Sequence, residues 1–243
     1  MPTDSWIDEL RADRIDQALD HLRQEPQSPS NYYSLGAVYM WSEDYQSALV
    51  HFDEQIRAAL PRNPPSDLTF GMAGAAAWCL GDEKLAIEYW RKGTTAGYAV
   101  AGANTRTALL LYAASVMEPA TFSTESAEKL LVKKANHRRV ENWPGPIAQY
   151  ILGTECEQEV RHKAVDRNGD PDPKSWQLDF YKLLKTTASA STEMHKLESG
   201  FQNLLNVKGS EYSAGIKFFY FLRLEEFYLA RHWPSKRTGV QLA

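Results

Sequence analysis

The segment that decides the fold begins with Tyr32-Tyr-Ser-Leu-Gly-Ala-Val-Tyr39 and resumes with Ala48-Leu-Val-His-Phe52. Apolar and small residues recur at spacings of three and four, which is typical of helices that bury one face. The small residues Gly36 and Ala48 let two antiparallel helices approach closely, while Tyr39 and Phe52 fill the space beside them. A helix pair of this kind cannot bury its apolar faces alone, so it stacks on neighbouring pairs and leaves a groove on one side.

This spacing is similar to the tetratricopeptide (TPR) signature, in which W-x2-L-G-x2-Y, A-x3-F and a closing proline mark a helix-turn-helix of about 34 residues. A second unit follows, with the matching positions taken by Phe70, Gly74, Gly81, Ala86 and Trp90. The prolines within residues 61–65 interrupt the helical pattern between the two units. The resemblance therefore predicts two tandem helical repeats.

The remainder of the chain also has helical patterning. Residues 103–117 and 124–136 predict a third pair, and Trp143-Pro-Gly-Pro146 predicts a rigid turn that starts a further helix. The segment from this turn to Gly153 resembles the one that follows the repeats in bacterial TPR proteins, including an envelope lipoprotein adaptor family.

We therefore predict an all-α protein, a TPR-like right-handed helical-repeat solenoid with a degenerate C-terminal helical extension. The predicted parts are an N-terminal helix at 1–28, repeats at 29–140, a helical extension at 141–232 and a tail at 233–243. A last helix is expected over about 211–230. It is apolar nearly all round, which indicates either burial at the end of the solenoid or an interface.

The composition is that of an ordinary soluble protein, with 43% hydrophobic and 24% charged residues. No apolar run reaches the ~18 residues of a membrane span, and the N-terminus has no secretory signal pattern. We therefore expect a cytoplasmic protein with no membrane partner. Cys79 and Cys156 are expected to be reduced thiols.

The first quarter of the chain is acidic. Residues 1–60 contain eleven acids and four arginines, a net charge of −7. Asp13, Asp16 and Asp20 lie three and four residues apart and are expected to share one face of the N-terminal helix. Such a face would steer a cationic partner and repel nucleic acid. The alternative is that these acids only solvate helix faces.

Motifs for chemistry are incomplete. Glu159-x-x-His162 resembles half of a di-iron site, but a second Glu-x-x-His motif is missing, so a solvated ion pair is expected. Residues 166–170 imitate the start of a calcium loop, yet Pro171 replaces the required glycine. The basic run at 129–139 lacks interleaved aromatic residues and is expected to be a solvated helix end. We predict a protein that is not an enzyme and has no metal, cofactor or nucleic-acid partner.

The resemblance to TPR proteins also implies which side chains face the groove. In each first helix, positions 2, 5, 9, 12 and 13 are expected there. These are Ser30, Tyr33, Ala37, Met40 and Trp41 in the first repeat, and Leu68, Gly71, Ala75, Trp78 and Cys79 in the second. The lysine, arginine and asparagine residues with which some TPR domains clamp a peptide carboxylate are absent from these positions.

The predicted partner-binding residues are the large groove side chains and the acidic N-terminal face: Tyr33, Met40, Trp41, Leu68, Trp78, Asp13, Asp16 and Asp20. Exposed aromatic groups dominate protein–protein contacts. Tryptophan is usually largely buried, so Trp41 and Trp78 could instead pack under neighbouring helices.

Two functions fit these expectations. The first is an immunity or antitoxin-like protein that binds and occludes a cognate basic effector or toxin. The second is an adaptor that presents substrates to a protease or hydrolase, as the resemblance to the lipoprotein family implies. The sequence predicts neither the oligomeric state nor which surface the partner uses.

Overall fold

The computed structural model describes residues 5–59, 64–98, 104–137, 139–164, 173–189, 194–206 and 224–238. Within these ranges every regular element is a helix, apart from an isolated bridge between Ser66 and Tyr98. The all-α prediction is therefore confirmed for the described chain. The helices are α1 Ser5–Arg11, α2 Ile15–Gln24, α3 Pro29–Trp41, α4 Tyr45–Ala58, α5 Asp67–Cys79, α6 Glu83–Thr94, α7 Thr105–Met117, α8 Thr124–Ala135, α9 Gly145–Ile151, α10 Glu157–Lys163, α11 Pro173–Ser189, α12 Met194–Asn206 and α15 Glu225–Thr238.

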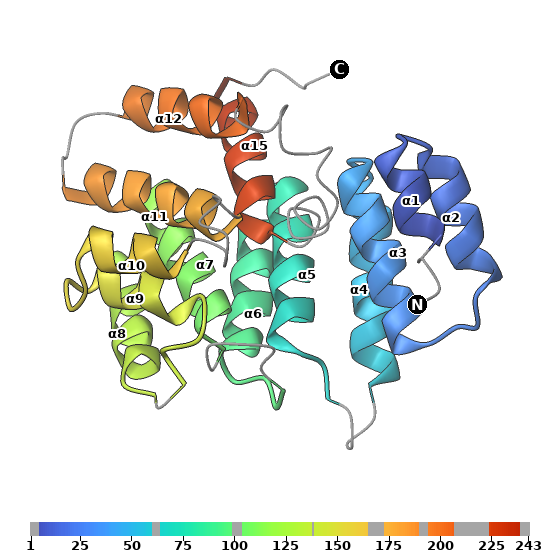
Figure 1. Ribbon diagram of the computed structural model, residues 1–243, viewed down its shortest axis with the longest axis horizontal. Coiled ribbons are helices and arrows are strands. Elements are labelled where there is room, and N and C mark those ends of the chain that lie inside the picture. Colours follow the sequence, from blue (N-terminus) through green and yellow to red (C-terminus); the bar gives the residue numbers. More distant parts are fainter. Residues whose placement is uncertain are drawn as a thin grey trace.

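Helix pairs α1–α2, α3–α4, α5–α6 and α7–α8 pack against one another in chain order (Figure 1). Most of these helices are preceded by a serine or aspartate, the residue types that cap the N-terminus of a helix. The side chains of Ser28, Asp44, Ser66, Asp82 and Ser123 each accept a hydrogen bond from a backbone amide in the first turn of α3, α4, α5, α6 and α8. Local sequence therefore fixes where most of these helices begin.

The turns inside the first three pairs share one geometry. Asp13, Glu43 and Gly81 have positive φ values of 59°, 66° and 84°. The amide of each donates to the carbonyl three residues earlier, and each precedes the N-cap residue of the second helix. A residue in the left-handed region commonly closes a helix in this way. The same turn thus recurs three times along the stack.

The N-terminal part was wrongly predicted as one helix. Residues 5–24 form two helices, and Asp13 lies in the turn between them. The turn has no glycine, and Arg14 at the N-cap of α2 makes no side-chain cap. The two sequence signals that mark the α5–α6 turn, Gly81 and Asp82, therefore have no counterpart here.

Small residues hold the pairs together as the sequence indicates. A Cβ atom on Gly36 would lie 2.6 Å from the ring of Phe52, and one on Gly74 would lie 2.2 Å from the indole of Trp90. Phe52 and Trp90 are both fully buried, each in the second helix of its pair. The close approach of the two helices is thus filled by an aromatic ring in both pairs.

The third pair, α7–α8, matches its predicted range closely, and α7 is buried along almost its whole length. Helices α9 to α12 then continue the fold beside it (Figure 1). Pro146 lies in the first turn of α9, as expected. Gly145 is pressed against the backbone, since a Cβ atom there would lie 1.8 Å from the carbonyl oxygen of Val140.

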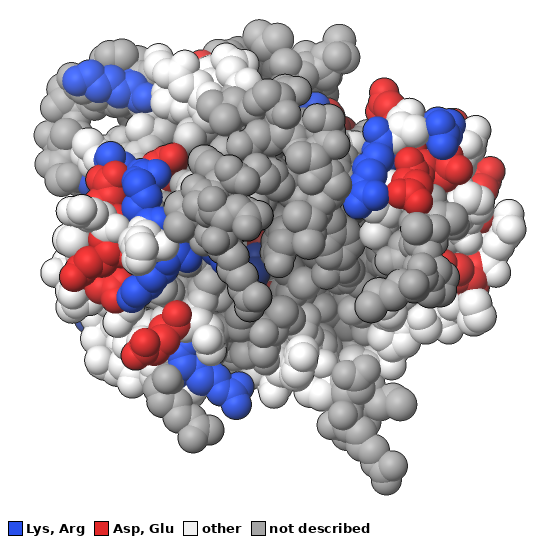
Figure 2. Space-filling view, viewed as in Figure 1, with Lys and Arg blue, Asp and Glu red and all other residues white. Residues whose placement is uncertain are grey.

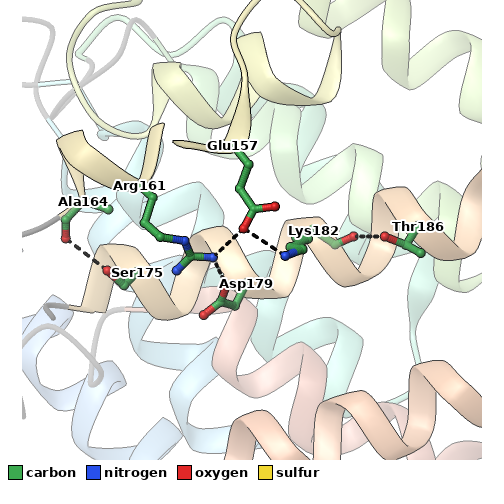
Figure 3. Close-up of polar contacts among 7 residues, drawn as sticks. All are labelled: Glu157, Arg161, Ala164, Ser175, Asp179, Lys182 and Thr186. Carbon is green, nitrogen blue, oxygen red and sulfur yellow. Dashed lines mark hydrogen bonds and ion pairs between the residues drawn. The ribbon is translucent and has the colours of Figure 1, made fainter. Parts of the chain in front are cut away.

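Charged side chains of both signs lie at the left and at the right of the surface that Figure 2 shows, and those at the right lie over α1 and α2. A small network of ion pairs joins α10 to α11 (Figure 3). Arg161 pairs with Glu157 at 2.9 Å and with Asp179 at 2.6 Å, while Lys182 pairs with Glu157 at 2.9 Å. These groups are about two-fifths exposed. Such pairs fix the mutual position of two helices but contribute little stability.

The last described helix differs from its prediction. α15 extends to Thr238, so the expected tail at 233–243 is helical over its first six residues. Residues 211–223 of the predicted last helix lie outside the described residues. Residues 224–230 and Trp233 are buried, which matches the first of the two alternatives, burial within the fold, for the described part of this helix.

Candidate partner-binding site

Helix α15 packs against α5 and α7, each the first helix of its pair. The predicted groove positions Gly71 and Cys79 lie on α5. Near its start, Glu225 contacts Gly71 of α5 and Arg106 in the first turn of α7. Further along, Trp233 donates its indole N–H to the carbonyl of Met117, the last residue of α7, at 3.4 Å. α15 therefore runs in the same direction as α7 and contacts residues at both of its ends.

Aromatic and sulfur contacts line the middle of this interface. The ring of Phe227 stacks on Trp41 of α3, with centroids 6.3 Å apart. The thiol of Cys79 donates to the carbonyl of Tyr228 at 3.9 Å. We call the surface under α15, formed by Trp41, Gly71, Cys79, Arg106 and Met117, the α15 channel. Three of these residues, Trp41, Gly71 and Cys79, belong to the groove positions predicted from the sequence.

The middle of α15 is held by the α3–α4 turn. Arg231 forms an ion pair with Glu43. His232 is hydrogen bonded to the hydroxyl of Tyr45 at 2.6 Å, and the two rings meet edge to face. Because Glu43 and Tyr45 lie in and next to the recurring turn, the geometry of that turn also positions Arg231 and His232 of α15.

A buried polar cluster surrounds the beginning of α15. Glu225 accepts from Arg106 at 2.8 Å. Glu226 accepts from the amide nitrogen of Gln177 at 2.7 Å and from the hydroxyl of Tyr181 at 2.8 Å, both on α11. The indole of Trp143 in turn donates to the amide oxygen of Gln177 at 2.6 Å. The Trp-Pro-Gly-Pro turn thus supports α15 through one glutamine.

The cluster carries an excess of negative charge. Asp67, Glu225 and Glu226 are all fully buried; Arg106, with its side chain 18% exposed, interacts with all three, and Lys134 interacts with Asp67. Oε1 of Glu225 and Oε2 of Glu226 have no hydrogen-bond partner among the described residues. Buried carboxylate oxygens without partners cost free energy.

Burial and neighbouring charges shift the pKa values of Glu225, Arg106 and Tyr181. The pKa of Glu225 is raised to about 7, chiefly by burial; Arg106 opposes this rise and Glu226 adds to it. Burial disfavours the charged guanidinium, yet the three carboxylates raise the pKa of Arg106 above its usual value. Burial also raises the pKa of Tyr181, with a further contribution from Glu226. Tyr181 is thus a neutral hydrogen-bond donor at ordinary pH.

The predicted aromatic groove residues do not form one surface. Trp41 is half-buried under Phe227, whereas Met40 and Trp78 are fully buried. Trp78 packs on Trp90 of α6, with ring centroids 5.7 Å apart, as the alternative for this residue expects. It is therefore part of the core between α5 and α6.

Tyr33 and Leu68 border a separate open pocket of about 250 Å³ at the other end of α3 and α5. The pocket is lined by proline and aromatic side chains together with polar groups, namely Pro29, Ser30, Tyr33, Gln55, Ala59, Pro64, Pro65, Ser66, Leu68 and Tyr98. The described residues of α15 do not line this pocket, so α15 does not cover this part of the predicted groove.

The predicted acidic face is also divided. Asp16 and Asp20 lie one turn apart on α2, but Asp13 lies in the preceding turn, so the prediction of one shared helix face is wrong for Asp13. Asp20 pairs with Arg23 at 3.1 Å. Asp13 and Asp16 are exposed, have no ion pair among the described residues, and border an open hollow of about 490 Å³ with Ser42.

Candidate metal ligands do not gather in the described part of the chain. No group of three or more histidine, cysteine, aspartate or glutamate side chains could hold a metal ion there. Glu159 accepts from the backbone amide of Cys156 and thereby caps α10. The described Glu159 contacts do not include the expected ion pair with His162. The calcium-loop imitation at 166–170 lies outside the described residues.

The sequence analysis missed the buried polar cluster. Glu225 and Glu226 interrupt an otherwise apolar segment, between Leu224 and Phe227. Charged residues inside such a run are a signal for buried, paired carboxylates. Their partners Arg106, Gln177 and Tyr181 are distant in sequence and have no local signature.

No protein-family model, curated protein or solved structure matches the chain. Over the ranges that the structure describes, no helix combines the length and the apolar character needed to cross a membrane.

Proposed function

We propose that the chain is a protein-binding, non-catalytic helical-repeat protein of the TPR type that occludes a basic partner, in the manner of an immunity or antitoxin protein. The shared turn geometry of the first three helix pairs supports a repeat architecture. So does the recurring glycine–aromatic contact of α3–α4 and α5–α6.

The observation that carries the choice of partner is the exposed acidic surface of α1–α2. Described residues 5–25 contain six acids and three arginines, a net charge of −3. Three of the acids, Asp8, Glu9 and Asp20, are paired with arginines, so the uncompensated charge comes from Asp13 and Asp16 at the hollow and from Glu25. Exposed charge of this kind accelerates and selects encounters with a cationic partner.

Affinity purification from cells of the source organism tests the proposal. The baits are the wild-type chain, the variant Asp13→Asn/Asp16→Asn/Asp20→Asn, and a matched control, Glu88→Gln/Glu125→Gln/Glu128→Gln, which removes exposed acids from α6 and α8. Recovered proteins are identified by mass spectrometry, and binding of the purified partner is then measured at low and high salt.

We expect a basic partner that the wild-type and control baits recover equally, with affinity for the α1–α2 variant reduced on the order of tenfold at low salt. If all three baits bound every partner with equal affinity, the proposal that the α1–α2 acids select a basic partner would be refuted. A protease or hydrolase as the partner would favour the adaptor function instead.

A further inference from the structure

The open pocket beside Tyr33 and Leu68 has walls that the fold already holds in place. Three of its lining residues are prolines, whose backbone is restricted. The amide of Asp67 donates to the carbonyl of Tyr98 at 3.1 Å, which ties another part of the wall to the start of α5. A cavity formed in advance spares a ligand the cost of ordering it.

The size and charge of this pocket restrict what it can hold. The described residues that line it include no charged side chain. Burial of a charge without a counter-charge is costly, so this lining disfavours lysine and arginine side chains. The volume of about 250 Å³ is below the ~300–1,000 Å³ of clefts that hold cofactors and drug-sized ligands. The pocket therefore suits one large, uncharged side chain.

Gln55 on α4 adds a polar group to the lining. Its amide oxygen Oε1 is buried and has no hydrogen-bond partner among the described residues. A buried acceptor without a donor costs free energy. The last torsion of a glutamine side chain is soft, so the amide can turn this oxygen toward a donor in the pocket. A ligand that brings one N–H or O–H group would remove the cost.

Aromatic and apolar groups surround this amide. Tyr98, which also lines the pocket, is 56% exposed and is one of few large exposed apolar residues in the described chain. Tyr33 and Leu68 are positions that the sequence pattern alone predicts to face a groove. Exposed aromatic groups of this kind are enriched where proteins bind each other.

We propose that the open pocket receives a tryptophan side chain of the partner protein. Tryptophan combines a large apolar ring system with one N–H donor and no acceptor, which matches the apolar walls and the oxygen of Gln55. It is also enriched among the residues that carry most of the energy of protein–protein binding. This inference rests on the proposed protein-binding function and adds an uncharged anchor to the charged surface of α1–α2.

Indole tests the pocket on the full-length ¹⁵N-labelled protein before any partner is known. 1-Benzothiophene is the matched probe, because it has nearly the same shape and its sulfur replaces the N–H group. The variant Gln55→Leu removes the acceptor, and Gln46→Leu, at an exposed position on the same helix, is the control. Circular dichroism shows whether both variants keep the helical content of the wild type.

We expect indole to bind the wild type with a Kd on the order of 1 mM and to shift the amide signals of Tyr33, Gln55 and Leu68. The preference for indole over 1-benzothiophene should fall about fivefold in Gln55→Leu, the change expected from one hydrogen bond, and stay unchanged in Gln46→Leu. Indole shifts that lie elsewhere on the protein would overturn the proposal. So would the same preference in Gln55→Leu and the wild type.

The variant Ser30→Phe tests the pocket against the partner that the baits recover. Ser30 is exposed and lines the pocket, so the larger side chain narrows the pocket without removing a core residue. We expect the affinity for the partner to fall at least about tenfold, whereas Ser30→Ala leaves it unchanged. If the two variants bound the partner equally well, the pocket would not be the place where the partner is anchored.

The two proposals fail in different ways. If indole binds in the pocket but no bait recovers a partner, the protein-binding function fails, and the tryptophan anchor fails with it. If a basic partner is recovered and Ser30→Phe binds it as tightly as Ser30→Ala does, the function stands and the tryptophan anchor alone is refuted.

Discussion

Gly74 lies against the buried indole of Trp90, whose N–H donates to the carbonyl of Gly71 at 3.0 Å. The change Gly74→Ala places a methyl group 2.2 Å from the indole nitrogen and should lower the free energy of unfolding by about 1–3 kcal/mol. Chemical denaturation measures the change. In Gly74→Ala/Trp90→Phe the smaller ring relieves the clash, so the two changes should cost less together than their sum. Strict additivity would contradict this account of the contact.

Arg106 is the cation that faces Asp67, Glu225 and Glu226 in the buried cluster. Its removal leaves buried carboxylates without a counter-charge, so Arg106→Gln should lower the free energy of unfolding by about 3–5 kcal/mol. The control Arg91→Gln, at an exposed position on α6, should change it by less than about 1 kcal/mol. Denaturation curves of the two variants that coincide would show that the cluster does not depend on its arginine.

At the scale of helices, the α15 contacts make stability depend on pH through Glu225. Its pKa is about 7 in the folded protein because burial disfavours the carboxylate. The folded state therefore binds this proton more tightly than the unfolded state does. The contribution of Glu225 to stability is full at low pH and is lost as pH rises through 7. The facing groups, Asp67, Arg106, Tyr181 and Glu226, set the size of this effect.

We expect the free energy of unfolding of the wild type to fall by about 1 kcal/mol more than that of Glu225→Gln between pH 6 and pH 8. Glutamine mimics the protonated side chain and does not titrate. Urea denaturation at several pH values provides the comparison. An identical pH dependence of the two proteins would mean that Glu225 does not titrate in this window.

The helix pairs also show what local sequence can and cannot predict. The boundaries of α3 to α6 and of α8 are predictable from local sequence because cap residues and small residues mark them, as at Asp82 and Gly74. The break at Asp13 was not, because an aspartate there adopts the backbone conformation that Gly81 adopts in α5–α6. The place of α15 depends on contacts with residues more than a hundred positions away, such as Glu225 with Arg106. The apolar pattern indicates that such a helix is buried, but it does not show which helices it packs against.

At the scale of the whole molecule, the stack of helix pairs has two ends of different character. The N-terminal pair exposes the acidic hollow at Asp13 and Asp16. Further along the stack, α15 packs on α5 and α7 (Figure 1). Of the predicted site, Trp41 lies in the covered channel, and Tyr33 and Leu68 border the open pocket. The sequence pattern predicts a groove along α3 and α5, but it could not show that α15 covers Trp41 and Cys79 at these positions.

The central claim is that α15 occupies the channel in the native protein. Hydrogen exchange of backbone amides in the full-length chain at neutral pH tests it most directly, since protection measures the free energy of local opening. Amides of residues 228–233 should be protected to about the same degree as those of α7, and Phe227→Leu should reduce protection in α15 much more than in α7. Exchange of residues 228–233 at the rate of an unfolded chain, while α7 remains protected, would contradict the account.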